Sequence, residues 1–256
     1  MFAALLALSI ASAAAAPLAP LAPPTAAAPV AATSDSTLYN TVLIQAAPGR
    51  LLEMIEYLQS TMPAYDAAHE PRPVMMRHTQ GDHWDIMLLV PMGASLGEYF
   101  SAARTVVRER AGLGRAYDER LRDLAQWREE TVVSGAPLAD LQARTAANGY
   151  VHIEMFVSRG GQQAALHHER EMENAMLAAT GQPTNLIFSR VFGGPWDSYT
   201  IGFYRDLKHY AEGSHGTPAD DEAAAKKAGF ASRAAMAQTL RELINNHHDT
   251  LAGIVK

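Results

Sequence analysis

The sequence GDHWD at 81–85 returns as GGPWD at 193–197, with glycine, tryptophan and aspartate in the same places at an offset of 112. Upstream, VLIQAAPG at 42–49 aligns with IEMFVSRG at 153–160, at an offset of 111. Matches that keep their order along a chain are typical of an internal repeat, so the sequence predicts a duplication. Downstream the offset is 119, and four residues recur identically: Leu121, Arg122, Leu124 and Thr131 as Leu240, Arg241, Leu243 and Thr250.

Each repeat has the pattern of a strand, a helix, a hairpin and further helix. Leu51, Ile55, Leu58 and Met62 recur at helical spacing directly after a strand-like segment. Two alternating segments joined by a glycine-containing turn then predict a hairpin. The predicted strands are 38–47, 74–79 and 84–90 in the first repeat and 150–158, 184–192 and 196–204 in the second, which also has a helix at 162–180.

The last part of each repeat is predicted to be helical. A helix that contains Tyr117 ends near Thr131, and the final helix runs from Met236 to His247 along one apolar stripe. We also expect a fourth strand in each repeat, near 130–133 or in the closing segment, but the pattern does not place it.

This order of elements, present twice, resembles the dimeric α/β-barrel superfamily, in which two ferredoxin-like sheets pack face to face. The resemblance rests on two strand–glycine–helix segments, at 42–56 and 150–166, and on the two GxxWD hairpins. It implies an α+β fold in which tandem ferredoxin-like repeats, 38–146 and 147–256, form one α/β barrel with extra C-terminal helices in each repeat. The superfamily includes cofactor-free monooxygenases, isomerase-like proteins and haem-binding enzymes.

The segment 1–34 contains no charged side chain. An apolar run from Phe2 to Ile10 precedes a zone of small residues, which is the plan of a secretory signal peptide. We therefore predict a signal peptide at 1–16, an Ala/Pro-rich linker at 17–37 and a periplasmic or secreted location. The apolar run is shorter than the ~20 residues of a membrane span, so we expect no membrane association once the signal is removed.

The composition narrows the classes of partner and cofactor. The 256 residues include 21 Lys and Arg against 27 Asp and Glu, a net charge of −6, which disfavours binding of nucleic acid through its phosphates. The chain has no cysteine, and it contains no HExxH, GxGxxG or P-loop pattern, so no metal site and no cofactor can be named from motifs. The expected partners are a small-molecule ligand and, by resemblance to single-repeat members that pair two chains, a second copy.

His152 and Glu154 are the predicted catalytic residues. They alternate with Val151, Ile153 and Met155 along one strand, so the two sets point to opposite faces. We expect the apolar set to face the helices and the polar pair to face into the barrel. There they would act as a general base with its orienting carboxylate, or as a metal-contact pair. A structural hydrogen-bonded pair is the alternative.

Three further residues are predicted to bind the ligand. Arg190, on a neighbouring strand, would pair with Glu154 inside the barrel or hold an anion, unless it is simply solvated. His78 lies on the corresponding strand of the first repeat. His248 belongs to the polar cluster NNHHDT at 245–250, which the first repeat lacks, although a histidine at a helix C-terminus also has a purely structural explanation.

Together these features predict an exported protein that binds a small molecule in the barrel. The alternative is a cofactor-independent monooxygenase- or isomerase-like enzyme, with His152 as base and Arg190 or His248 holding an anionic oxygen. A third hypothesis is haem binding, since axial ligation needs only one histidine. Asp85 and Asp197, which follow the two tryptophans, are predicted to be structural.

Overall fold

The computed structural model describes residues 36–213 and 216–256. The predicted signal peptide, and all but the last two residues of the predicted linker, lie outside the described residues. Within the described ranges, no helix is both long and apolar enough to cross a membrane.

The strands and helices fall into two halves joined by α6 (Leu138–Ala147). The first half contains β1 (Thr37–Ala46), α1 (Leu51–Ser60), α2 (Met62–Ala67), β2 (Val74–Gln80), β3 (Ile86–Gly93), α3 (Leu96–Tyr99), α4 (Ala102–Ala111), α5 (Arg115–Leu124) and β4 (Ala125–Gly135). The second half contains β5 (Tyr150–Ser158), α7 (Gln163–Ala179), β6 (Leu186–Gly193), β7 (Ser198–Tyr204), α8 (Leu207–Glu212), α9 (Pro218–Lys227), α10 (Ala235–Leu243) and β8 (Ile244–Val255).

The strands form one closed barrel in the order β1-β3-β2-β8-β5-β7-β6-β4. The first half supplies the sheet β4-β1-β3-β2 and the second half the sheet β6-β7-β5-β8, so the barrel is built from one sheet of each half. The antiparallel pairs β2–β8 and β4–β6 join the two sheets. The predicted α+β fold is confirmed.

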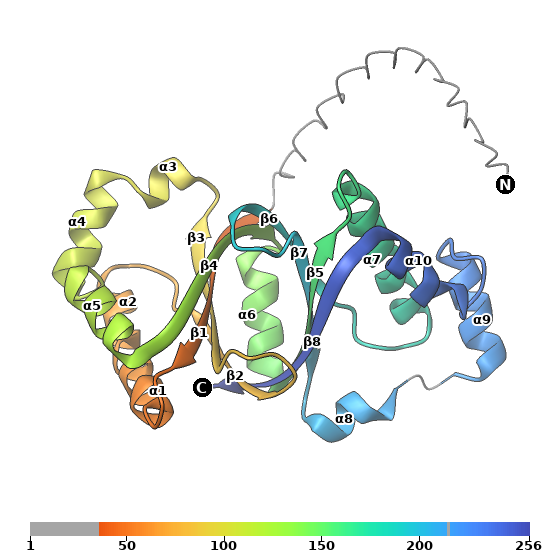
Figure 1. The fold of residues 1–256 in the computed structure, drawn as a ribbon, viewed down its shortest axis with the longest axis horizontal. Coiled ribbons are helices and arrows are strands. Elements are labelled where there is room, and N and C mark those ends of the chain that lie inside the picture. The colour runs from red at the N-terminus through yellow and green to blue at the C-terminus, as the bar shows by residue number, and fades with distance from the viewer. Residues whose placement is uncertain (1–35, 214–215) are drawn as a thin grey trace, which may run out of the picture.

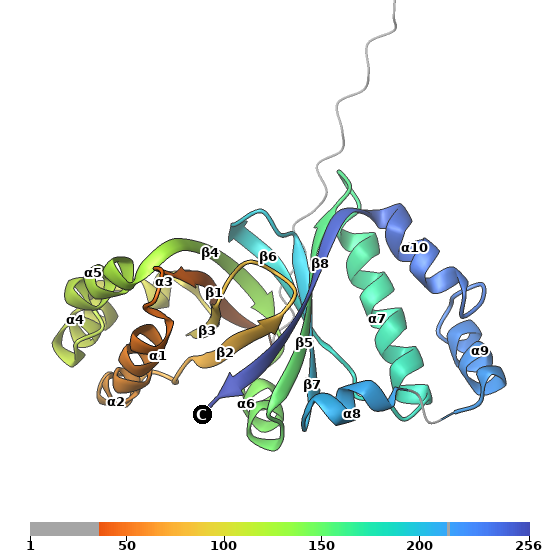
Figure 2. The same ribbon diagram turned by 60° about the horizontal axis from the view of Figure 1, so that its bottom comes forward.

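The helices cover the outside of the barrel. Helices α1, α2, α4 and α5 lie on one side, and α7, α9 and α10 lie on the other (Figure 1). In the second half, α7 lies between the sheet and the outer helices α9 and α10 (Figure 2). In α6, the fully buried Leu141 packs against the interior of the barrel.

The interior of the barrel is filled with apolar side chains from both sheets. A hydrogen bond of 2.6 Å between the hydroxyls of Thr41 and Tyr199 crosses from β1 to β7. Val151, Ile153 and Met155 belong to this interior cluster. The prediction that these residues face the helices is therefore wrong, whereas a ligand inside the barrel stays a prediction. Each inner face is covered by the opposite sheet, so it is the inner face that must be apolar.

Equivalent hydrogen bonds fix how the two halves correspond. Asp85 Oδ2 accepts from the backbone N–H of Ala46 at 2.8 Å, and Asp197 Oδ2 accepts from that of Ser158 at 2.9 Å. These aspartates thus have the predicted structural role: each holds the end of a neighbouring strand, and Asp197 also pairs with Arg190 of its own hairpin. Ala46 and Ser158 are related by an offset of 112, the same as that of the two hairpins.

The offset of 111 for the first strands is therefore wrong by one position. At 112, His152 corresponds to Asn40 and Glu154 to Val42. A shift of one residue along a strand exchanges its two faces. An offset of 111 would instead place His152 at Thr41, a residue whose side chain points into the barrel.

The helices before β4 and β8 end earlier than predicted. The backbone N–H of Ala47 donates to the carbonyl of Leu124, and that of Arg159 donates to Leu243, both at 2.8 Å. From these points the chain continues as β4 and β8, which pair along β1 and β5. The expectation of a fourth strand in each half is confirmed, whereas the helices predicted to reach Thr131 and His247 are wrong. The backbone N–H and C=O groups of β1 and β5 need partners along both edges, and β4 and β8 supply them along one edge of each. Helical periodicity in the sequence does not indicate this requirement.

Candidate functional site

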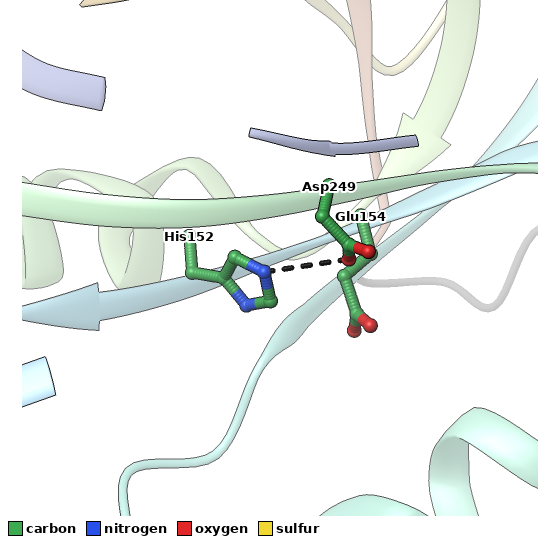
Figure 3. A group of neighbouring side chains, drawn as sticks. All are labelled: His152, Glu154 and Asp249. Atoms are coloured by element: carbon green, nitrogen blue, oxygen red, sulfur yellow. Dashed lines mark ion pairs between the residues drawn. The ribbon is translucent and has the colours of Figure 1, made fainter. Parts of the chain in front are cut away.

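His152 and Glu154 lie on the helix-facing side of β5, beside Asp249 of β8 (Figure 3). In the antiparallel register Glu154 pairs with Asp249. The Nε2 atom of His152 is 3.4 Å from Oδ1 of Asp249, and the two side chains are 20% and 52% exposed. The predicted pair is thus joined by a second carboxylate, but outside the barrel rather than within it.

Helix α7 covers this group with a buried arginine. Arg170 donates from Nε and Nη2 to the two carboxylate oxygens of Glu169, at 2.6 and 2.7 Å. Its Nη1 lies 3.0 Å from Glu173 and 3.5 Å from Glu154, and its guanidinium stacks over the ring of Phe156 at 5.0 Å. One guanidinium therefore faces three carboxylates, and the sheet surface beneath α7 carries charge beside the apolar cluster of Phe156, Leu166 and Ile244.

The charges around this surface shift several pKa values. Burial lowers the pKa of His152, but the nearby carboxylates of Asp249 and Glu154 outweigh it, and the pKa is raised overall. The nearby imidazole of His152 lowers the pKa of Asp249. Burial, followed by the charges of nearby carboxylates, raises the pKa of Glu173 to about 7 against the opposing effect of Arg170.

The three predicted ligand-binding residues lie elsewhere. Arg190 pairs with Asp197 at the end of its own hairpin. Glu154, the partner predicted for Arg190, pairs with Arg170 instead. The ring of His78 packs edge-on against Trp84, with centroids 5.7 Å apart.

His248 also points away from the group around Asp249, because successive residues of a strand face opposite sides. Its Nδ1 lies 3.1 Å from Oδ2 of Asp82, and its ring packs edge-on against Trp196. The structure therefore does not bring Arg190, His78 or His248 to His152.

Sequence analysis did not identify Arg170 and Glu173 as parts of the site. Arg170 and Glu169 are 3% and 2% exposed, although charged residues are rarely buried unless they are paired. One feature of the sequence indicates that Arg170 is buried. It lies four residues after the apolar Leu166, so both side chains are on the helix face that packs against the sheet. Asp249 belongs to the polar cluster at 245–250. Sequence analysis predicted that this cluster lies at the end of a helix, and so did not reveal that it lies on a strand beside β5.

A cavity of about 680 Å³ lies over the helix-facing side of the first sheet. It is bounded by β1, β3 and β4, by the helices α2, α3, α4 and α5, and by Phe192 of β6. Its aromatic lining residues are Tyr65, Tyr99, Phe100, Tyr117 and Phe192. Phe100 and Phe192 are 61% and 48% exposed, so they supply apolar surface that faces solvent beside the cavity.

The strands supply a polar floor to this cavity. Asn40 Nδ2 donates to Glu130 Oε2 at 2.7 Å, and Arg128 Nη2 lies 2.6 Å from the other oxygen of Glu130. Asn40 and Glu130 occupy the positions that His152 and Asp249 hold in the second half, at offsets of 112 and 119. The two halves thus place a polar pair at the same point of each sheet, but the first pair faces a cavity.

Neither a protein-family model nor a curated protein matches the sequence. In structure, the chain is similar to an anthrone oxidase-like protein, with a TM-score of 0.59 and 11% identity over 88% of this chain and 93% of that chain. The two chains thus share a fold, in agreement with the fold that the resemblance to the dimeric α/β-barrel superfamily implies.

Two other solved structures with looser similarity are a heme-binding protein from Thermus thermophilus and a chlorite dismutase variant from Candidatus Nitrospira defluvii. Their TM-scores are 0.45 and 0.46, with 10% and 12% identity over 86% of this chain and 92% of each of theirs. At such identities these likenesses concern the fold alone.

The cavity of the first half does not offer the usual ligands of haem. Its lining includes no histidine. Burial raises the pKa of the Tyr117 phenol to about 12 and also raises that of Tyr65, so neither is a ready phenolate ligand. The lining residues therefore do not fit haem.

Proposed function

We propose that the protein binds an aromatic small molecule that carries a hydroxyl or keto oxygen, in the cavity over the first sheet. The observation that carries this proposal is the cavity itself. Its volume of about 680 Å³ lies within the ~300–1,000 Å³ of typical small-molecule sites. Five aromatic side chains line it, and aromatic rings favour stacked or edge-on contacts with a planar ligand.

The polar floor sets the chemistry at one end of such a ligand. The amide of Asn40 and the guanidinium of Arg128 can donate hydrogen bonds to a keto oxygen, and the carboxylate of Glu130 can accept one from a hydroxyl. Positive and negative charges of the lining balance, which favours a neutral ligand. They are Arg108, Arg115, Arg122 and Arg128 against Glu109, Asp118, Glu119 and Glu130.

An enzyme of the monooxygenase or isomerase type is the second candidate, and Glu130 is the residue that favours it. Its carboxylate is held by Asn40 and Arg128 on the cavity floor, where it would take the proton of a bound phenol or enol. We also propose, from the uncharged N-terminal segment, that the protein acts after export. Mass spectrometry of protein from the exported fraction should then show a chain that lacks the apolar run from Phe2 to Ile10.

Fluorescence titration of tag-free protein with 1-naphthol and with naphthalene tests the binding proposal. We expect 1-naphthol to bind more tightly, because only naphthol has a hydroxyl for the polar floor. Asn40→Ala should weaken naphthol binding about five- to tenfold, the effect of one lost hydrogen bond. His152→Ala, at the equivalent position of the second half, is the matched control and should leave the affinity unchanged. The proposal is wrong if neither compound binds, or if His152→Ala weakens binding and Asn40→Ala does not.

A further inference from the structure

The helix-facing side of the second sheet holds a group of donor atoms remote from this cavity. One donor atom from each of His152, Glu154 and Asp249 lies within 4.8 Å of the other two. Figure 3 shows the imidazole of His152 directed at the carboxylate of Asp249, with Glu154 beside them. The three residues stand on two hydrogen-bonded strands, so their spacing is set by the register of the sheet rather than by a loop.

His247 lies beside this group, next to Asp249, but is not one of the three residues whose donor atoms lie within 4.8 Å of one another. It precedes Asp249 by two residues on β8 and so shares its face. The Nε2 atom of His247 is 3.4 Å from Oδ2 of Asp249, while that of His152 is 3.4 Å from Oδ1. The carboxylate of Asp249 thus lies between two imidazoles. The ring of His247 stacks on Phe156, with centroids 6.3 Å apart, and this contact orients it.

These spacings are longer than those of charge-assisted hydrogen bonds. An N–H···O bond between charged groups is ~2.7–2.9 Å long, whereas both imidazoles stand 3.4 Å from Asp249. Two ligands of a tetrahedral Zn²⁺, each at ~2.1 Å from the ion, are ~3.4 Å apart. The distance from each imidazole to Asp249 therefore matches that between two ligands of one ion.

The charges of the surroundings also favour a cation. Glu154, Glu169 and Glu173 share the guanidinium of Arg170. Among the residues that the structure describes, the ion pairs of Asp249 are only with the two imidazoles. Three carboxylates thus share one arginine, and Asp249 is a fourth carboxylate with no arginine or lysine partner among the described residues. The exposed fractions of Asp249 and His247, 52% and 36%, leave a path for an ion from solvent.

We propose that His152, Glu154 and Asp249 bind a divalent transition-metal ion, with Zn²⁺ as the best match, and that His247 orients the carboxylate of Asp249. Imidazole and carboxylate ligands suit Zn²⁺, and Co²⁺ accepts the same donor set. Because the chain has no cysteine, the site is not of the soft thiolate type. It belongs to the second half and is independent of the aromatic ligand proposed for the first.

Metal titration of tag-free protein stripped with EDTA tests this site. We expect one Co²⁺ per chain, with visible absorption bands of a four-coordinate ion that Zn²⁺ then abolishes by displacement. Zn²⁺ should also raise the melting temperature. Asp249→Asn and His152→Gln should each weaken Zn²⁺ binding beyond the ~10–100-fold that loss of an outer-shell partner costs. Glu130→Gln changes the equivalent residue of the first half and should bind Zn²⁺ like the wild type.

Two outcomes would overturn the proposal. One is the absence of stoichiometric Co²⁺ or Zn²⁺ binding by the folded wild-type protein. The other is unchanged Zn²⁺ affinity in folded His152→Gln and Asp249→Asn, which would place the ion elsewhere. If Asp249→Asn does not fold, by circular dichroism, His152→Gln and Glu154→Gln decide the question.

Discussion

The two sheets have equivalent strands, but their helix-facing sides differ in chemistry. In the first half, Val42 of β1 and Leu58 of α1 belong to one buried apolar cluster. At the equivalent positions of the second half, given by the offset of 112, stand Glu154 and Arg170. An apolar contact between helix and sheet in one half is thus replaced by an ion pair in the other.

The difference shows which part of the fold tolerates change. The inner faces of the two sheets cover each other and share one largely apolar core, so a charged group there needs a partner inside the barrel, as His248 has in Asp82. Each outer face is covered only by the helices of its own half, which can change together with it. This freedom gave the first half a cavity with a polar floor and the second half a group of imidazoles and carboxylates.

The largest expected effect comes from placing the residue of the first half into the second. Arg170→Leu should lower the free energy of unfolding by ~3–5 kcal/mol, because it leaves buried Glu169 and its neighbours without a cation. Urea denaturation measures the loss. Adding Glu169→Leu should restore part of the stability, because it removes the most buried of the stranded carboxylates. A loss below ~1 kcal/mol for the single variant, the level of an exposed ion pair, would show that the ion pairs do not hold α7 on the sheet.

The apolar counterpart of Arg170 is expected to cost slightly less. Leu58 is 1% exposed, and Leu58→Ala should lower the free energy of unfolding by ~2–5 kcal/mol through lost burial and the cavity it leaves. The same urea experiment at pH 5 and pH 8 should give equal losses, because no charged group is removed. A strong pH dependence would mean that this half also relies on charge.

Glu173 should make the second half sensitive to pH in a defined direction. Burial raises its pKa to about 7 in the folded protein, so folding binds a proton between the unfolded pKa of ~4.3 and pH 7. Stability is therefore lost as the pH rises through this range. Glu173→Gln keeps an oxygen that can accept from Arg170 but carries no charge. It should raise the melting temperature at pH 8 and change it little at pH 4; a lower melting temperature at pH 8 would contradict this account.

The smallest effect is expected from His152→Asn, which introduces the residue found at the equivalent position of the first half. The pKa of His152 is raised, so its pairing with Asp249 stabilises the fold fully below the unfolded pKa of ~6.5 and is lost as the pH rises above the folded value. Because Asp249 is half exposed, the loss in the variant should be only ~0.2–1 kcal/mol at pH 5.5. Urea midpoints in EDTA at pH 5.5 and pH 8.5 measure it, and equal losses at both would exclude the ion pair as its cause.

Much of the fold was accessible from the sequence. The repeated GxxWD segments and the alternation of apolar and polar residues in 150–158 are local patterns, and the hairpins and the predicted fold class followed from them. The same patterns brought His152 and Glu154 together, because residues two apart on a strand always share a face. They did not reveal Arg170, whose burial depends on carboxylates from another element.

The sequence by itself determined that His152 and Glu154 share one face and that Val151 and Ile153 share the other. Only the tertiary structure decided which face is inside, because alternation is unchanged when a strand is turned over. That choice depends on what covers each side: an apolar sheet lies against Val151 and Ile153, and the charged face of α7 lies against Glu154. The same holds for Asp249, which reaches His152 because β8 must pair with β5 to close the barrel.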